Sequence, residues 1–387
     1  MSNAEIKQTI SDVFEELATA LETGAMGPNI KIALTINGSE HGYDVMKEAA
    51  EKARAKELFE VVLIGEEQDW TDDYEFYEAT SEEEVEATLD RLLDEDVVQG
   101  GVTLHHAFPI GVSTVGRIFA PATNRDVFIA TTTGTTATVR NQALVLNTIN
   151  GIIAAKAAGI SEPTVGVLNV DGANTTERAL KALADNGYEI TFGQSIRADG
   201  GSVLRGNDLL VGSTDVIVTD SLTGNILMKL FSAYNTGGRV EATGYGYGPG
   251  IGEGFDKNIH IVSRASGAAV IANAMEYAYQ VAKGGLVQVS QAEYKKAHKA
   301  KLGDILEGLT PKEKAATSDE TVEMPEKEVV TESISGIDVL DLDLAVELLW
   351  KADIYAESGM GCAGPIVLVS EANVAKARDM MQAEGLV

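Results

Sequence analysis

The sequence has one cysteine, Cys362, among its 387 residues. A single cysteine cannot form an internal disulfide, and no cysteine and histidine cluster has the spacing of a zinc site. No apolar stretch reaches the roughly 20 residues of a membrane-spanning helix, and the first residues contain no apolar core of the signal-peptide type. These absences predict a protein of the reducing cytoplasm that needs no metal.

Positive charge is also scarce, because the chain has 30 Lys and Arg but 59 Asp and Glu, which gives a net charge of -29. A chain this acidic repels phosphodiester backbones and anionic lipids, so neither a nucleic acid nor a membrane is expected as a partner. Apolar residues make up 44% of the chain. This share is typical of globular proteins, and the length suffices for two or three lobes with buried cores.

Strand-like apolar runs alternate with helical patterns over residues 30–299, which we interpret as a core. The predicted strands span residues 30–36, 59–65, 97–104, 127–131, 164–170, 189–192, 215–219 and 259–262. The predicted helices span residues 41–56, 81–94, 141–158, 175–186, from about 223 onward, and 266–283. This alternation predicts an α/β fold with a largely parallel sheet layered by helices, in two lobes.

Three further segments flank this core. Residues 1–29 place Ile6, Ile10, Val13, Phe14, Leu17 and Leu21 at helical spacing, which predicts an amphipathic helix packed on the body or on a partner. Residues 300–335 are polar and predict a linker or a long loop. In residues 336–387 we predict a helix over 342–350, a small-residue loop over 357–364, a strand over 366–369 and a helix over 371–383. We expect this C-terminal segment to dock on the core, with its loop facing the open ends of the core strands.

The β-branched run that ends at Asp220 is followed by a predicted helix, which Thr223 or Ser221 could cap. Free N–H groups at a helix start, together with the helix dipole, favour a bound phosphate. Its predicted contacts are Thr223, Gly224, Asn225 and Asp220, with Lys229 adding charge about a turn and a half further on. The same pattern also fits a plain helix cap.

Three other segments could contribute to a site. Residues 131–140 supply hydroxyls, Gly134 and one cation, Arg140, and suit either an anion or a polar loop. His105 and His106 end a predicted strand, where either could act as a base, contact an anion or be structural. The glycine-rich residues 244–254 lack the Lys-Ser/Thr ending of a P-loop.

Cys362 lies in the segment Ser-Gly-Met-Gly-Cys-Ala-Gly-Pro, residues 358–365. Its small neighbours leave the sulfur unshielded and bring backbone N–H groups close, which can stabilise a thiolate and later the oxyanion of a thioester under attack. A structural cysteine is usually packed in an apolar strand or helix. We therefore predict that Cys362 is a reactive thiol.

The core resembles the bacterial phosphate acyltransferases of phospholipid synthesis. The matching stretches are Ile32–Gly38, Glu162–Asn169 and, most specifically, Val216–Lys229. The resemblance implies a fold related to phosphotransacetylases and isocitrate dehydrogenases. Two turns depart from that family, at His105-His106 and at Ser263–Ser266. The tail around Cys362 is outside its pattern and is similar to the family of component C alpha subunits of glycine/sarcosine/betaine reductases.

The second resemblance implies an acyltransferase within a reductase complex. A carboxymethylated selenoprotein partner and the beta subunit of component C would act with it, as parts of an oligomer. Cys362 would hold an acetyl group as a thioester, and inorganic phosphate would release acetyl phosphate. The alternatives are an acyl-carrier-protein:phosphate acyltransferase that does not need Cys362, and a non-catalytic scaffold subunit. No nicotinamide fingerprint is found, which argues against a dehydrogenase, and no cofactor is predicted.

Overall fold

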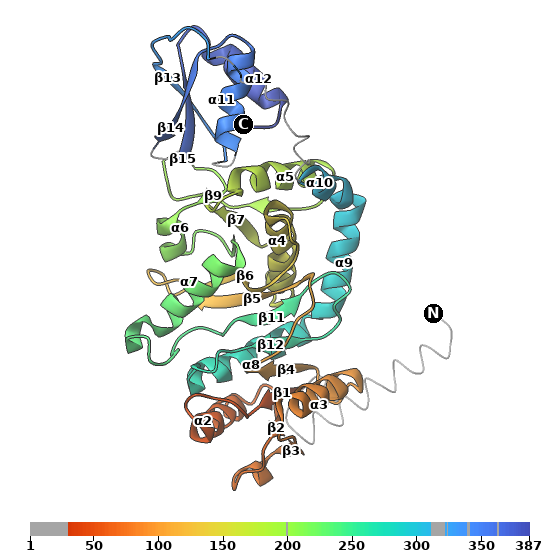
Figure 1. The fold of residues 1–387 in the computed structure, drawn as a ribbon. Coiled ribbons are helices and arrows are strands. Elements are labelled where there is room, and N and C mark those ends of the chain that lie inside the picture. Colours follow the sequence, from red (N-terminus) through yellow and green to blue (C-terminus); the bar gives the residue numbers. More distant parts are fainter. Residues whose placement is uncertain (1–29, 199, 311–321, 323, 339–340, 362–363) are drawn as a thin grey trace, which may run out of the picture.

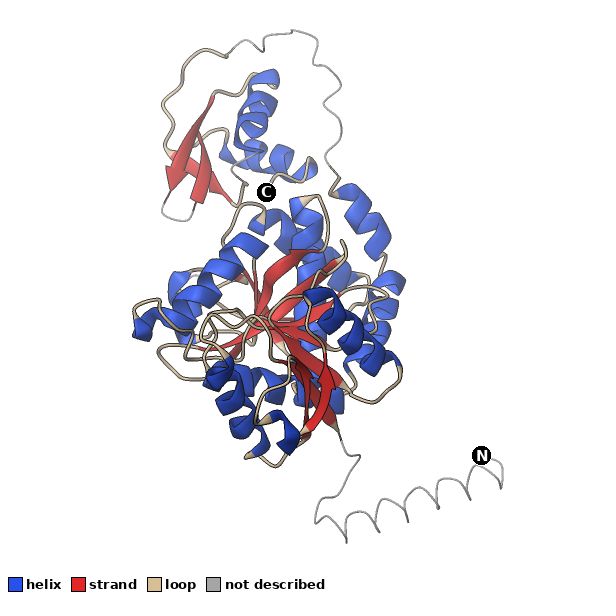
Figure 2. Ribbon diagram, turned by 60° about the horizontal axis from the view of Figure 1, so that its bottom comes forward, coloured by secondary structure: helices blue, strands red, loops and turns tan. Residues whose placement is uncertain are grey.

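The structure is a computed structural model that describes residues 30–387 except 199, 311–321, 323, 339–340 and 362–363. A large mixed sheet has helices on both faces, and a small three-stranded sheet lies near the C-terminus (Figure 1, Figure 2). The strand order of the large sheet is β3-β2-β1-β4-β12-β11-β5-β6-β10-β7-β8, and β9 also pairs with β7. The α/β class predicted from the sequence is confirmed. The helix predicted within residues 1–29 lies outside the described residues.

One half of the large sheet is parallel and built around the first strand. Its strands are β1 (Lys31–Thr35), β2 (Glu60–Gly65), β3 (Glu75–Glu78), β4 (Gly100–Thr103) and β12 (Ile259–Ile261). The short 3-10 helix η1 (Thr71–Asp73) connects β2 to β3. Helices α2 (Tyr43–Arg54) and α8 (Ala268–Lys283) cover one face, and α3 (Glu82–Asp94) covers the other. A capping box of Ser81 and Glu84 begins α3.

The other half is also parallel and contains β6 (Asp126–Thr135), β10 (Val216–Val218), β7 (Thr164–Leu168), β8 (Thr191–Phe192) and β9 (Val203–Leu204). Side chains alternate along β6, so Phe128 and Ala130 pack toward α4 (Arg140–Ala157), while Val127 and Ile129 pack toward α7 (Ser221–Ala233). Helices α5 (Ala173–Asp185) and α9 (Leu286–Lys299) share the face of α4, and the short α6 (Gly206–Val211) shares that of α7.

Two antiparallel strands join the halves, and the sequence patterns predicted neither of them. They are β5 (Val112–Phe119) and β11 (Gly248–Ile251). The sequence of β11 is Gly-Pro-Gly-Ile, which has little intrinsic preference for a strand. Here glycine permits a close backbone approach, because a Cβ on Gly248 would collide with the carbonyl of Val115. Tertiary packing, not local propensity, therefore creates the centre of the sheet.

The segment predicted as a polar linker, residues 300–335, is partly regular. It contains α10 (Leu302–Gly308) and β13 (Glu332–Ser335). The predicted small-residue loop over 357–364 is also corrected, because β14 (Ala356–Gly361) and β15 (Gly364–Val369) form an antiparallel pair. Strand β13 pairs with the other edge of β15. Glycine lowers strand propensity locally, but pairing with the apolar β15 outweighs it. Helices α11 (Leu342–Lys351) and α12 (Val374–Ala383) complete this tail.

The tail has a hydrophobic core of its own, built only from residues 334–387, including Ile334, Leu349, Val367 and Met381. It lies next to α5 in Figure 1. The contacts with α5 are polar. The carboxylate of Asp338 accepts hydrogen bonds from the backbone and hydroxyl of Thr175, and Arg178 Nη1 donates to the carbonyl of Gly336 over 3.2 Å. The tail is thus a small separate packing unit held to the core by hydrogen bonds.

His260 on β12 makes stability depend on pH. Its side chain is fully buried, with Nε2 3.0 Å from Asn258 Oδ1 and its ring edge against Tyr277, and burial lowers its pKa to about 3. Because an unfolded histidine titrates near pH 6.5, stability should be lost as pH falls from there toward 3, by about 1.4 kcal/mol per pH unit. Chemical denaturation should show a shallower pH dependence for His260→Asn. The half-exposed His298 provides a comparison variant, His298→Asn, for the loss of a histidine at the surface. Equal slopes for wild type and His260→Asn would contradict this assignment.

Candidate functional site

The candidate site lies at the carboxyl end of β10, where the neighbouring parallel strand β6 continues past it to Thr135. The chain leaves β6 into α4 on one face of the sheet and leaves β10 into α7 on the other. Adjacent parallel strands whose connections run to opposite faces open a crevice at their carboxyl ends. Ligands of open α/β sheets bind in such crevices.

A cavity of about 290 Å³ occupies this crevice. It joins two segments that the sequence suggested separately, namely the Thr/Gly loop after β6 and the helix start after β10. Its lining residues are Thr131, Gly134, Thr135, Thr136, Ala137, Arg140, Ala143, Leu144, Asn147, Asp220, Ser221 and Leu222. Arg140 is the one cation and Asp220 the one acid of this lining.

Asp220 is the N-cap of α7, a role that the sequence analysis gave to Thr223 or Ser221. Its carboxylate accepts hydrogen bonds from the Thr223 backbone N–H over 3.0 Å and from the Thr223 hydroxyl over 2.7 Å. The backbone N–H and the hydroxyl of Thr223 are therefore already hydrogen-bonded to Asp220. The N–H groups of Ser221 and Leu222, in the first helical positions, have no partner within the helix, and both residues line the cavity.

The start of α4 faces the same cavity. Its N-cap, Val139, makes no side-chain capping hydrogen bond, so the first N–H groups of α4 lack both a helical and a side-chain partner at this end. The side chain of Arg140 is about half exposed, with Nη1 3.8 Å from Asp171 Oδ2. Two positive helix ends and a guanidinium thus meet at one cavity, which favours an anion.

Buried hydrogen bonds hold the walls of the cavity in place. Thr136 Oγ1 donates to Asn147 Oδ1 over 2.8 Å, and Asn147 Nδ2 donates to the carbonyl of Thr219 over 3.1 Å. Thr131 Oγ1 donates to the carbonyl of Thr114 over 2.6 Å. The sequence analysis did not single out Asn147. A polar residue in the middle of the largely apolar α4 pattern is the signal that could have revealed it.

Gly224 and Asn225 fasten α7 to β6. A Cβ on Gly224 would collide with the carbonyl of Thr131, so only glycine permits this helix to pack so closely. Asn225 Nδ2 donates to the carbonyl of Thr132 over 3.2 Å. Neither residue lines the cavity. The structure therefore gives both a packing role, and their predicted contact with phosphate stays a prediction.

Lys229 lies away from the cavity. Its Nζ donates to Glu241 Oε1 over 2.7 Å and to Ser263 Oγ over 2.8 Å. Glu241 is only 2% exposed and also accepts hydrogen bonds from Ser266 and Tyr247. Burial, with the Glu241 charge beside it, raises the pKa of the Tyr247 hydroxyl far above its usual range. Lys229 therefore compensates a buried carboxylate and ties α7 to the loop after β12.

Lys229→Ala is expected to lower stability rather than phosphate binding. It leaves the Glu241 charge without its cation, at a cost of about 1–3 kcal/mol. Urea denaturation should show this loss, and Glu241→Gln in the same chain should recover part of it, because the neutral amide needs no cation. An unchanged stability with a large loss of phosphate use would instead place Lys229 at the anion.

His105 and His106 lie in the other half of the sheet, and neither lines the cavity. His106 Nδ1 is 3.1 Å from Glu86 Oε1 and its ring packs on Phe108; burial lowers its pKa, although Glu86 opposes the shift. His105 is exposed and borders a small hollow of about 30 Å³ at the ends of β1 and β4. His106 is thus held against α3, while His105 faces solvent.

Cys362 lies outside the described residues. Strand β14 ends before it at Gly361 and β15 begins after it at Gly364, and these two glycines are paired. The expected position of the thiol relative to the cavity therefore stays a prediction.

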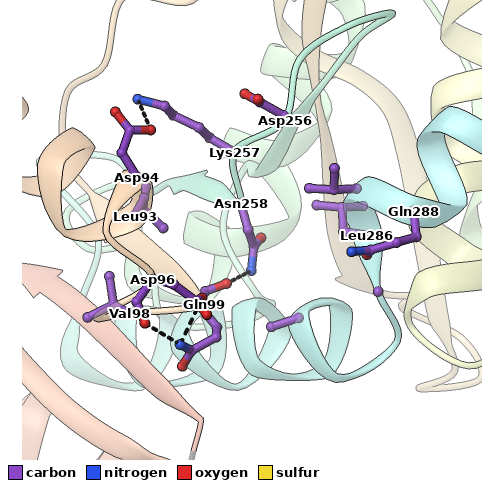
Figure 3. Close-up of a pocket in the computed structure, with 13 residues that line it drawn as sticks. Leu93, Asp94, Asp96, Val98, Gln99, Asp256, Lys257, Asn258, Leu286 and Gln288 are labelled. Atoms are coloured by element: carbon purple, nitrogen blue, oxygen red, sulfur yellow. Dashed lines mark hydrogen bonds and ion pairs between the residues drawn. The ribbon is translucent and has the colours of Figure 1, made fainter. Parts of the chain in front are cut away.

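A second cavity, of about 350 Å³, lies at the amino ends of the strands β4 and β12 (Figure 3). It is lined by Gln99 and Asn258, which precede β4 and β12, and by Lys257. Some of its polar groups are already paired. Asn258 Nδ2 donates to the carbonyl of Gln99, and Lys257 is within 3.2 Å of carboxylates of Asp90 and Asp94. The start of α9 also lines this cavity, but Asp94, Asp96 and Asp256 make its lining acidic, so it is less suited to an anion than the first cavity.

Across the described ranges, no group of three or more His, Cys, Asp or Glu is placed to hold a metal ion. In the same ranges, no helix is long and apolar enough to cross a membrane.

The chain is a member of the family described as "Fatty acid synthesis protein", whose sequence model matches residues 30–368. Over 99% of its length it is 53% identical to the whole of the glycine/sarcosine/betaine reductase complex component C subunit alpha of Peptoclostridium acidaminophilum. Both resemblances inferred from sequence motifs are thereby confirmed.

More distant relatives cover the core. A phosphate acyltransferase of Staphylococcus haemolyticus is 26% identical over 239 residues, which span 52% of this chain and 70% of the relative. A branched-chain phosphotransacylase structure from Enterococcus faecalis V583 superposes with a TM-score of 0.47 at 16% identity, covering 65% of this chain and 99% of that one.

Proposed function

We propose that this chain is an acyl-transferring alpha subunit of a reductase complex of the component C type. Cys362 holds an acetyl group as a thioester, and inorganic phosphate attacks it to release acetyl phosphate. The full-length similarity to a component C alpha subunit supports the complex, and the phosphate acyltransferase relatives support the transfer. The proposed partners are the beta subunit and a carboxymethylated selenoprotein, and the proposed location is the cytoplasm.

The observation that carries the proposal is the cavity between β6 and β10. The starts of α4 and α7 present N–H groups to it, and Arg140 adds a positive charge. A phosphate there is attracted by two helix dipoles and a guanidinium in a chain that otherwise repels anions. The adjoining Asp220 carboxylate is turned to Thr223, which limits its repulsion.

In the proposed step, a phosphate oxygen attacks the thioester carbonyl carbon. The new C–O bond forms, the C–S bond breaks, and the thiolate of Cys362 leaves. The reacting atoms must approach to roughly 3–3.5 Å. The tail is suited to bring the acyl group, because its hydrophobic core is its own and its contacts with α5 are a few hydrogen bonds that can be exchanged for water. His105 and His106 stay predicted catalytic residues, but both lie in the other half of the sheet, so no step at this cavity is assigned to them.

Isotope exchange tests this proposal. Purified chain, acetyl phosphate and radiolabelled phosphate should yield labelled acetyl phosphate, because an acetyl-enzyme can return its acetyl group to any bound phosphate. Exchange activity that co-purifies with the chain supports the mechanism. If no exchange occurs, either with the chain alone or with the beta subunit present, the result favours the non-catalytic scaffold hypothesis.

A further inference from the structure

Helix α4 contains two buried asparagines one turn apart, Asn147 and Asn150, among buried residues that are mostly apolar. Asn147 is 2% exposed and Asn150 is fully buried. Burying an amide costs free energy unless its polar atoms are hydrogen-bonded, and asparagine also has a low helix propensity. An apolar residue at either position would avoid both costs, which points to a specific role for each amide.

The Asn147 amide joins the two segments that line the candidate cavity. Its Oδ1 accepts a hydrogen bond from Thr136 Oγ1 over 2.8 Å, on the loop before α4. Its Nδ2 donates over 3.1 Å to the carbonyl of Thr219, which directly precedes Asp220, the N-cap of α7. The same carbonyl accepts from the backbone N–H of Thr131 on β6 over 3.2 Å. One planar side chain therefore connects the loop that leads into α4 with the turn that leads into α7.

The Asn150 amide makes contacts of the same kind away from the cavity. Its Nδ2 donates to the carbonyl of Ile251 over 2.8 Å and to Ser113 Oγ over 3.2 Å. Its Oδ1 accepts from the Tyr294 hydroxyl over 2.7 Å. Neither Asn150 nor any of these partners lines the cavity, whereas Asn147 does. The two asparagines are thus matched in burial and hydrogen bonding, and they differ in whether they hold the cavity walls.

The separation of the two helix starts matters because one anion has to contact both. Helix N–H groups act on an anion within hydrogen-bond distance, and the influence of the helix dipole falls off within the first turn. We propose that Asn147 is a positioning residue of the anion site, whose amide holds the starts of α4 and α7 at the separation at which one phosphate contacts both. This inference rests on the proposed function, because phosphate is taken as the anion.

Thermal stabilisation of the full chain by inorganic phosphate compares variants without requiring turnover. Asn147→Ala and Asn150→Ala should both lower the melting temperature, because each removes one buried, hydrogen-bonded amide. Only Asn147→Ala should raise the phosphate concentration needed for half-maximal stabilisation, by about ten-fold, as expected when one hydrogen bond to the anion is lost. A shift of equal size in both variants, or in neither, overturns the proposal.

Asn147→Asp adds a readout that a merely structural role would not change. The ionised carboxylate still accepts from Thr136, but it cannot donate to the carbonyl of Thr219, and it repels the anion. The protonated carboxyl group donates again. Phosphate binding by Asn147→Asp, relative to the wild type at the same pH, should therefore recover as the pH is lowered. Relative binding that stays equally weak at every pH contradicts the proposal.

The outcomes separate this inference from the proposed function. If the wild type catalyses no phosphate exchange but the two alanine variants still differ in phosphate binding, the proposed function fails and the role of Asn147 stands. If exchange occurs and Asn147→Ala and Asn150→Ala shift the phosphate dependence equally, only the role of Asn147 fails. A wild type that phosphate does not stabilise at any concentration overturns the anion site, and the positioning role with it.

Discussion

Replacement of Cys362 by serine is expected to abolish acetylation of the chain by acetyl phosphate and to reduce phosphate exchange to background. A thioester keeps its acetyl group activated because a thiolate is a good leaving group, whereas a serine ester does not return the group readily to phosphate. The sequence predicts that N–H groups of the glycine-rich residues 358–365 favour the thiolate. Intact mass spectrometry should show one acetyl group, removable by hydroxylamine, on the wild type only.

Ser358→Ala is the matched control, because it changes β14 in the same hairpin and leaves the thiol in place. This variant should still carry the adduct. Acetylation confined to lysines would remove Cys362 as the carrier. Exchange that persists in Cys362→Ser would favour the other enzyme hypothesis, a phosphate acyltransferase that passes the acyl group directly from a carrier protein to phosphate.

Arg140→Ala is expected to raise the phosphate concentration needed for half-maximal exchange by about ten- to a hundred-fold. The lost interaction is a charge-assisted hydrogen bond to an anion, worth roughly 1.5–3 kcal/mol. The ion pair with Asp171 at 3.8 Å is exposed and contributes little, so its loss cannot account for such an effect. The measurement is the exchange rate as a function of phosphate concentration.

Arg91→Ala is the control for a changed surface charge. Arg91 is 49% exposed and pairs with Glu95 over 3.1 Å on α3, in the other half of the sheet. Its replacement should leave phosphate saturation unchanged. If Arg140→Ala behaved like Arg91→Ala while Asn225→Ala lost phosphate use, the anion would have to lie deeper, between α7 and β6.

The predictable part of the fold followed periodic patterns. Strands β1, β2, β7 and β15 are short apolar runs between polar turns, and each lies within two residues of its predicted bounds at either end. The central strand β5 was missed because Ser113, Thr114 and Arg117 interrupt its apolar pattern. All three are buried, and their side chains hydrogen-bond to neighbouring elements, such as Arg117 Nη1 to Gln280 on α8. Such partners are distant in sequence and cannot be read from a local window.

The candidate site, like the fold, was only partly predictable from the sequence. The sequence pattern located both the loop that ends at Arg140 and the helix start at Asp220, because small and hydroxyl residues follow a β-branched strand in each case. It did not show that they line one cavity. It also assigned phosphate contacts to Gly224, Asn225 and Lys229, whose partners in the structure are the backbone of β6 and the buried Glu241.

The sequence by itself determined the family, the α/β class, the strong acidity and the one thiol available for acyl chemistry, since these depend on composition, motifs and local periodicity. Tertiary structure alone decided which groups meet. The pairing of β6 with β10 across more than 80 intervening residues brings two helix starts to one cavity. The packing of Gly224 against Thr131 directs one face of α7 into the core and leaves its second apolar face outside. Both depend on long-range contacts, which no local pattern of residues specifies.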